Sequence, residues 1–265
     1  MNKAVVYGAY SRWISYFQNT EYAARDYPHA DELVLLAPMK AELPPEVFTR
    51  LFEPPKSDGN GFDRDNLLKA SKLLDDAGWV LKNRLRVNVK TGKPLSFELL
   101  IASGANDQWV LPFKKNLARL GVTMNIRQVD IAQLTNRKRS RDYDMMQTLW
   151  AAQPWPSSDL QISWASGYID SSYNAPGVKS PVIDALIAKI VAAQGDKEKL
   201  LPLGRALDRV LTWNYYMLPM WYMGEDRVAR WDKFSLPAVR PVYTLGFDTW
   251  WYDVNKAAKL PAARR

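Results

Sequence analysis

Apolar residues recur at three-and-four spacing in four stretches of the chain, and this spacing predicts amphipathic helices. The first begins near Phe62 and ends at Gly78. The second begins after Asp107 and ends at Gly121, and the last two are separated by Gly195. Each glycine stands where a helix C-terminus favours a left-handed residue. The ends of these helices are therefore defined by the sequence itself.

Residues suited to cap helices stand at the starts of these stretches. Asp63 or Asp65 can cap the first helix, and Ser180 followed by Pro181 is typical of a capped start with proline in the first turn. Pro112 lies early in the second helix and predicts either a late start or a kink.

Between the helices the apolar residues alternate with polar ones, which predicts strands. Residues 84–89 and 95–101 flank a turn at Thr91-Gly92 and are expected to form a hairpin-like unit. Further strands are expected at 122–129 and 143–150, with a short polar helix at 131–138 between them. The order strand, helix, strand, helix, strand predicts an α/β fold with a parallel sheet and βαβ crossovers.

Two stretches lack a clear period. Residues 151–179 are rich in Pro, Ser, Trp and Tyr and are interpreted as a long functional loop. Residues 215–223 are almost wholly apolar and contain Pro219, so we expect a buried strand there that leads into a domain crossing.

Composition narrows the classes of function. The 265 residues are 47% hydrophobic and 24% charged, which is typical of a globular chain, and no apolar run is long enough for a membrane-spanning helix. The chain has no cysteine and a single histidine, His29, which excludes disulfides, thiolate nucleophiles and cysteine-ligated metals within this chain. We expect no metal site and no cofactor. The first residues show no apolar region of the kind that marks an export signal.

The net charge of +8 is concentrated in residues 61–150, mainly at 82–93 and at Arg137, Lys138, Arg139 and Arg141. A basic interaction module for anionic partners is therefore one alternative function. Nucleic-acid binding is not expected, because the basic residues and the aromatic residues do not interleave as a stacking platform requires. A carboxylate-dependent hydrolase that uses the 151–179 loop is a second alternative, although the sequence singles out no acid–base pair.

Aromatic residues supply the candidate binding site. Trp150, Trp155, Trp164, Tyr168 and Tyr173 follow a predicted parallel strand at its carboxyl end, where open α/β sheets bind ligands. Gln153, Ser157, Ser158 and Asp159 add polar groups among them. Aromatic walls with a few polar groups are typical of a binding cleft that has no catalytic machinery.

Several stretches, taken in order, resemble the family 5 solute-binding proteins of ABC importers. They are KASKLLDDAGWVLKNRLRVNVKTGKPLSFELLIAS, LARLGVTMNIRQVD, RDYDMM and YNAPGVKSPVIDALI. Within that family, VVYGAYSRWISYFQNTEYAA and GFDTWWYDVNKA are most similar to the binders of oligopeptides and microcin C. The resemblance covers essentially the whole chain.

The resemblance implies a type II periplasmic-binding-protein-like lobe that captures peptides and is not an enzyme. The chain corresponds to the C-terminal half of a family member. Residues 62–240 would be the ligand-binding lobe, and 1–61 and 241–265 would complete or contact the other lobe. Closure of two lobes would bury the ligand and present it to the permease of an importer in the inner membrane, on the periplasmic side. Contact with the membrane would be peripheral.

The resemblance also places candidate ligand residues. Trp150, Gln153, Trp155, Ser157, Asp159 and Tyr173 would line the cleft, with Trp221 and Tyr222 near the hinge. Oligopeptide binders of this family often carry an aspartate after the central strand that pairs with the α-amino group of the peptide. Here that stretch carries neutral Gln153, and Asp159 lies further on. A modified or blocked peptide is therefore an alternative ligand to a plain oligopeptide.

Overall fold

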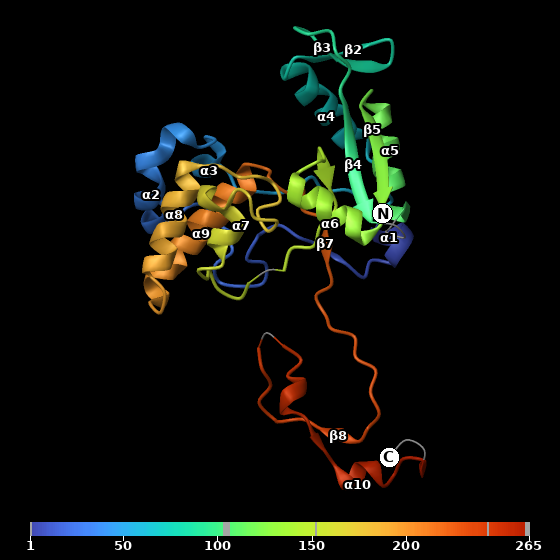
Figure 1. Ribbon diagram of the computed structural model, residues 1–265, viewed down its shortest axis with the longest axis vertical. Coiled ribbons are helices and arrows are strands. Elements are labelled where there is room, and N and C mark those ends of the chain that lie inside the picture. Colours follow the sequence, from blue (N-terminus) through green and yellow to red (C-terminus); the bar gives the residue numbers. More distant parts are fainter. Residues whose placement is uncertain (1, 103–106, 152, 243, 263–265) are drawn as a thin grey trace. The chain divides into compact units, whose positions relative to one another are not determined.

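The computed structural model describes residues 2–102, 107–151, 153–242 and 244–262 (Figure 1). The chain forms two compact units, unit 1 (Met1–Trp221) and unit 2 (Tyr222–Arg265). The expected segments 1–61, 62–240 and 241–265 concern the lobes of a longer protein, and they stay a prediction.

Unit 1 contains the predicted parallel sheet. Its central strand β4 (Ser96–Ala102) pairs in parallel with β5 (Thr123–Val129) and with β6 (Met145–Met146). Helices α5 (Asp107–Arg119) and α6 (Ile131–Ser140) form the crossovers. The predicted βαβ units are thus confirmed, and α6 is two residues longer than expected.

The first predicted helix is α4 (Arg64–Asp76), and its ends follow the sequence signals. Asp63 accepts a hydrogen bond from the backbone N–H of Asn66 at 2.8 Å, and Gly78 adopts a φ of +80° after the last turn. Helix α5 runs through Pro112, so the late start is wrong.

The predicted hairpin uses a different pair of strands. Strand β2 (Trp79–Lys82) pairs antiparallel with β3 (Leu85–Asn88), and the turn lies at Asn83-Arg84, which both have positive φ. The expected turn at Thr91-Gly92 does form, and the chain returns briefly along β3: Val87 bridges Pro94, and Leu95 N–H donates to the carbonyl of Arg86 at 2.7 Å. Residues 96–101 do not continue along β3. The reason is that consecutive residues of β4 are buried, as in the centre of a parallel sheet, so β4 pairs with β5 and β6 instead.

The strand predicted over 143–150 is reduced to β6, which pairs with Leu99 and Leu100. The backbone N–H of Gln147 still donates to the carbonyl of Leu100, and after it the chain leaves the sheet. Leu149 is 98% exposed, so its apolar character does not reflect burial in a strand.

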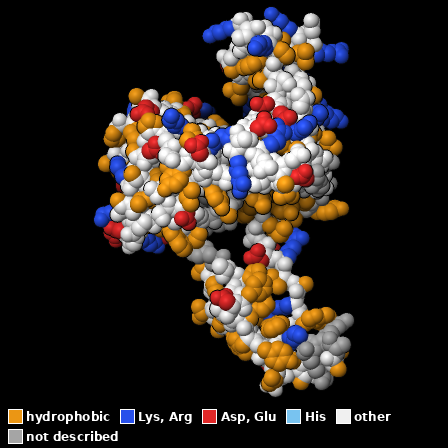
Figure 2. Space-filling view, viewed as in Figure 1, with side chains coloured by type: hydrophobic (Ala, Val, Ile, Leu, Met, Phe, Trp, Pro, Cys, Tyr) orange, Lys and Arg blue, Asp and Glu red, His pale blue; other side chains and the backbone are white. Residues whose placement is uncertain are grey.

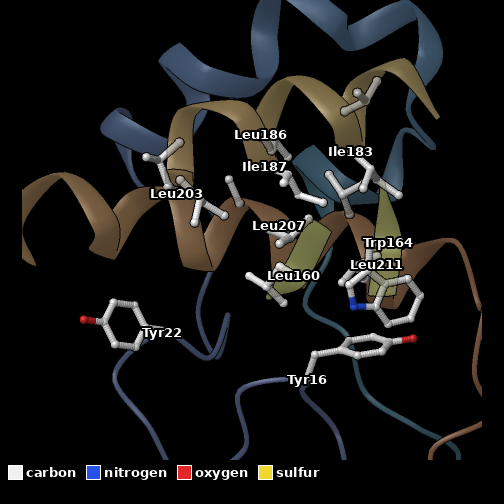
Figure 3. Packing of buried hydrophobic residues seen from close by; sticks show 14 of the residues in the cluster. Tyr16, Tyr22, Leu160, Trp164, Ile183, Leu186, Ile187, Leu203, Leu207 and Leu211 are labelled. Atoms are coloured by element: carbon white, nitrogen blue, oxygen red, sulfur yellow. The ribbon is translucent and has the colours of Figure 1, made fainter. Parts of the chain in front are cut away.

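The large core of unit 1 is helical (Figure 3). Helices α8 (Pro181–Ala192) and α9 (Lys197–Trp213) pack against each other with their predicted apolar stripes buried. Side chains of α7 (Leu160–Trp164) join the same core. The interpretation of 151–179 as irregular is therefore partly wrong: it holds α7 and the 3-10 helix η2 (Ser166–Tyr168), and Trp164 is a core residue rather than a cleft residue.

The N-terminal sixty residues also contribute to this core, and no elements were predicted there. The structure places in them short elements, namely α1 (Asn2–Val6), β1 (Ser11–Arg12), α2 (Ala30–Leu36), η1 (Ala37–Glu42) and α3 (Glu46–Thr49). Of these, α2 and α3 both contact α9.

The buried strand predicted over 215–223 is wrong. Tyr215, Leu218, Met220 and Met223 are exposed, and only β7 (Trp221–Tyr222) is a strand, paired with β1. Helix α9 ends at Trp213, before Pro219, and Tyr215 follows it with a positive φ of 53°.

Unit 2 is small and has little core. Strand β8 (Phe234–Ser235) pairs antiparallel with β9 (Trp251–Tyr252), between which lies the 3-10 helix η3 (Phe247–Thr249). Helix α10 (Val254–Ala257) is capped by Asp253, which also accepts a hydrogen bond from the hydroxyl of Ser235 at 2.8 Å. Across the described residues of both units, no helix has the length and apolar character needed to span a bilayer.

Candidate ligand-binding surface

The carboxyl ends of β4, β5 and β6 meet at one edge of the sheet, the edge at which open α/β sheets bind ligands. Helix α5 begins at this edge and carries Trp109 in its first turn. The ring of Trp109 stacks on Trp221 with 4.2 Å between centroids, and Tyr10 meets both rings edge-on. The structure thus places Trp221 at the carboxyl edge, within an aromatic cluster.

A second aromatic cluster surrounds Tyr16, whose ring lies beside Trp164 (Figure 3). Trp150 approaches the same ring at 5.5 Å between centroids, and its Nε1 donates to the backbone carbonyl of Tyr16 at 3.2 Å. The ring of Trp13 also meets the ring of Tyr16 edge-on, with 5.1 Å between centroids. Trp150 is therefore half-buried and fixed to the N-terminal segment.

Buried polar groups hold that N-terminal segment in place. The carboxylate of Asp208 on α9 is buried and accepts three hydrogen bonds, from Ser15 Oγ at 2.9 Å, Tyr16 N at 2.7 Å and Ala24 N at 2.8 Å. Burial raises the pKa of Asp208 to about 6, against the lowering effect of these donors and of Arg209. Asp208 therefore supports the position of Tyr16, and through it that of Trp150.

A buried ion pair lies next to this carboxylate. Arg209 donates through both Nε and Nη2 to Glu32 on α2, at 3.2 and 3.0 Å, and both side chains are almost fully buried. Nη2 also donates to the carbonyl of Asp26 at 2.9 Å. The pair borders a polar hollow that includes His29 and Arg205, and none of the predicted site residues lines it.

The predicted polar residues of the loop lie close together. Ser157 Oγ donates to Gln153 Oε1 at 2.7 Å, and the Asp159 backbone N–H reaches the same hydroxyl at 3.3 Å. Asp159 precedes α7 without capping it, and its exposed carboxylate has no hydrogen-bond partner among the described residues. Because only the oxygen of the Gln153 amide is engaged, its NH₂ group is left to donate to a ligand, and the Asp159 carboxylate is left to accept from one.

The packing of this loop comes from the end of α8 and from α9. Gln194 Nε2 donates to the carbonyl of Pro156 at 3.0 Å. A Cβ added to Gly204 would lie only 3.1 Å from Cγ of the Pro156 ring. Beside it Trp155 is 51% exposed. A glycine at 204 therefore allows the loop to approach α9 closely, and it leaves the Trp155 ring facing solvent.

Tyr173 is 69% exposed and belongs to a different part of the loop. Arg141 and Tyr143, which lie between α6 and β6, donate to the carbonyls of Asn174 and Ala175 at 3.3 and 2.7 Å. In the described residues, no ring contact joins Tyr173 or Trp155 to another predicted aromatic residue. Tyr222 is half-buried and begins unit 2.

The predicted site residues therefore fall into local groups: the Gln153–Ser157–Asp159 group with Trp155, the Tyr16 cluster with Trp150, the Trp109–Trp221 stack, and Tyr173. The structure adds Tyr16, Trp109 and Asp208, which the sequence did not predict as site residues. The only sequence signal for Asp208 is an acidic residue inside the apolar stripe of a helix, between Leu207 and Val210.

Two of the four basic residues at the end of α6, Arg137 and Arg141, form ion pairs within the fold. Arg137 bonds Glu98 and Asp142 at 2.8 and 2.9 Å, and Arg141 pairs with Asp170 at 3.9 Å. These contacts reduce the surface charge that an anionic partner would meet on α6. Among the described residues, no three His, Asp or Glu side chains come together as metal ligands.

Comparison with known proteins gives consistent results. The family described as "Bacterial extracellular solute-binding proteins, family 5 Middle" matches residues 1–172. The chain is 73% identical over 265 residues to "Uncharacterized protein YejA" of Escherichia coli K12, covering all of this chain and 44% of that protein. It is 38% identical over 254 residues to "Probable peptide-binding protein YejA" of Agrobacterium fabrum, covering 95% of this chain and 41% of that protein. The chain thus spans less than half the length of these relatives.

Solved structures share the fold. The oligopeptide-binding protein AppA from Bacillus subtilis, solved in complex with a nonapeptide, matches with a TM-score of 0.54 at 16% identity, covering 89% of this chain and 48% of AppA. This likeness confirms the predicted fold, a lobe of a type II periplasmic binding protein with parallel βαβ units and flanking helices. Because the family match covers more than half of its residues, this chain belongs to the family 5 bacterial extracellular solute-binding proteins.

Proposed function

We propose that the chain forms part of the substrate-binding component of an ABC importer, which holds a peptide or peptide-like ligand between two lobes and delivers it to the membrane permease. Membership of the family 5 solute-binding proteins is the observation that carries this proposal. The peptide-binding name of the Agrobacterium fabrum relative supports the ligand class. The extracellular character of the family supports a periplasmic location.

The proposed contacts follow from the exposed groups of the 150–173 region. Trp155 and Tyr173 offer apolar ring faces to ligand side chains, as aromatic walls do in binding sites. Because Gln153 Oε1 already accepts from Ser157, the amide nitrogen is left to donate to a peptide carbonyl. The free carboxylate of Asp159 is suited to a ligand amino group.

The half-buried tryptophans would have a different role. Trp150 and Trp221 are held by Tyr16 and Trp109, so they would provide a rigid base rather than wrap around the ligand. Tyr222 follows Trp221 at the start of unit 2, which supports a hinge position for this pair. A blocked or modified peptide remains compatible with this site if Asp159 is not used.

The direct test is calorimetric titration of a mixed peptide pool against the complete protein and its Trp155→Ala variant. Loss of an exposed aromatic contact should weaken binding by about 1–3 kcal/mol, or roughly fivefold to more than a hundredfold. Tyr27→Ala, which removes a similarly exposed aromatic residue outside the 151–179 loop, is the control and should bind normally. Unchanged affinity for Trp155→Ala would remove this residue from the site.

A second measurement addresses catalysis. Peptides recovered from the protein after long incubation should have unchanged mass, because the proposed function involves binding without bond cleavage. Cleavage of the peptide by the wild type, together with loss of that cleavage in the Asp159→Asn variant, would instead establish the hydrolase alternative.

A further inference from the structure

The β2–β3 hairpin has one face with an unusual composition. Because side chains alternate across a strand, one face carries Trp79, Leu81, Arg86 and Asn88, and the other carries Val80, Lys82, Leu85 and Val87. The second face continues to Val89, whose N–H donates to the carbonyl of Gly78. We call the five residues Val80, Lys82, Leu85, Val87 and Val89 the open face.

The opposite face of the hairpin is fixed to the rest of unit 1. The buried Arg86 donates to Ser71 and Asp75 on α4 and to the carbonyl of Leu120. A Cβ on Gly121 would lie 2.9 Å from the backbone nitrogen of Arg86, and Gly121 has a φ of +81°, so glycine allows the hairpin to approach this closely. Arg86 thus anchors the hairpin through this face, although Leu81 on the same face is 54% exposed. On the open face Lys82, Leu85 and Val89 are exposed, and Val80 and Val87 are half-buried.

The open face is apolar and surrounded by cations. Leu85 and Val89 are 45% and 55% exposed. Lys82 lies on the face, and Arg84, Lys90 and Lys93 lie in the adjoining turns, without an ion-pair partner among the described residues. The sequence contains no acidic residue between Asp76 and Glu98. Figure 2 shows Lys and Arg side chains (blue) at the end of unit 1 that carries β2 and β3 in Figure 1.

We propose that the open face docks on a bilayer surface that contains anionic lipids. Exposed aliphatic side chains ringed by lysine and arginine combine the two contributions of peripheral membrane binding, shallow apolar insertion and attraction to anionic headgroups. A second copy of the chain would bring like charges together. A protein partner is disfavoured, since protein interfaces are poor in lysine and rich in aromatic residues, and the open face has the reverse composition.

The position of the hairpin in the fold allows such docking while a ligand is bound. Arg86 N–H donates to the carbonyl of Gly121, just before β5, and Leu95 leads directly into β4. The hairpin therefore lies at the amino edge of the sheet, opposite the carboxyl edge and its aromatic cluster. The seven residues of β4 separate the two edges by about 23 Å at ~3.3 Å per residue.

The test is flotation of the mature protein, as its host produces it, with vesicles of phosphatidylcholine containing about 30 mol % phosphatidylglycerol. We expect binding to these vesicles, loss of binding to pure phosphatidylcholine, and weakening as salt rises from about 0.05 to about 0.5 M. Replacing Lys82→Glu and Arg84→Glu together should lower the partition coefficient at least about tenfold, because each basic residue near the surface contributes roughly fivefold.

The matched control is Lys114→Glu with Lys115→Glu, which makes the same charge change at exposed positions on α5. The partition coefficient of this variant should fall by no more than about threefold, since its cations lie outside the open face. Both variants should retain the peptide affinity of the wild type, so failure of membrane docking would leave the proposed function standing. Equal losses in the two variants, or a wild type that ignores anionic vesicles, would overturn the proposal. Capture of a protein partner through Lys82 in place of vesicle binding would overturn it too.

Discussion

In the helical part of unit 1, segments nearly two hundred residues apart share one core, whereas the sheet part is assembled from the single stretch 63–146. The helical core joins Tyr16 and Leu36 to α8 and α9. The buried cluster of the sheet is small: Leu99, Ile101, Val110 and Met124. The difference shows where each part obtains its stability, from long-range burial in the first and from local pairing and capping in the second.

The largest effect is expected in the helical core. Trp164 is fully buried among Tyr16, Trp150 and Tyr216, so Trp164→Ala should lower the free energy of unfolding by about 3–5 kcal/mol in urea denaturation. The Nε1 of Trp164 is buried without a partner, so Trp164→Phe should cost clearly less. Leu149→Ala, at an exposed position, should change stability by less than about 0.5 kcal/mol. Equal stability of Trp164→Ala and wild type would mean that this core is not cooperative.

A pH effect of similar size should come from Asp208. Its pKa is about 6 in the folded chain and near 3.8 when unfolded, so the folded state binds the proton more tightly. The contribution of this group to stability therefore rises as pH falls from about 6 to about 4, by about 3 kcal/mol.

The measurement is the free energy of unfolding of wild type and Asp208→Asn across this pH range. The difference between the two should shift steadily in favour of the wild type as pH falls. A difference that does not vary with pH would show that Asp208 titrates normally in the folded chain.

The smallest effect concerns the sheet part. Arg86→Met removes the hydrogen-bond donors to Leu120, Trp79 and Asp75. It should lower the free energy of unfolding by about 2 kcal/mol. Because these contacts are local, hydrogen exchange should speed up mainly in β2 and β3. Arg84→Met, at a neighbouring exposed position, is the control. Its free energy of unfolding should be within about 0.5 kcal/mol of the wild-type value. If exchange accelerates equally in α8 and α9, the two parts of unit 1 are not distinguishable in stability.

Local signals predicted the local elements well. Asp63, Gly78 and Gly121 marked helix ends as expected, and Ser180 caps α8. These signals work because capping hydrogen bonds and left-handed glycines act within a few residues of the position they define.

Apolar stretches without a clear period were predicted poorly. Trp164 was expected in a cleft and is core, and Tyr215 was expected in a buried strand and is exposed. An apolar residue is buried only where other segments cover it, and those segments are distant in the sequence.

The sequence by itself determined the family, the long helices α4, α5, α8 and α9, and the parallel βαβ arrangement, because periodicity and capping are properties of neighbouring residues. Only the tertiary structure decided that Tyr16 supports Trp150, that Asp208 holds the N-terminal segment, and that one face of the hairpin stays open. Burial and long-range hydrogen bonds depend on which distant segments meet, and no local pattern encodes that meeting.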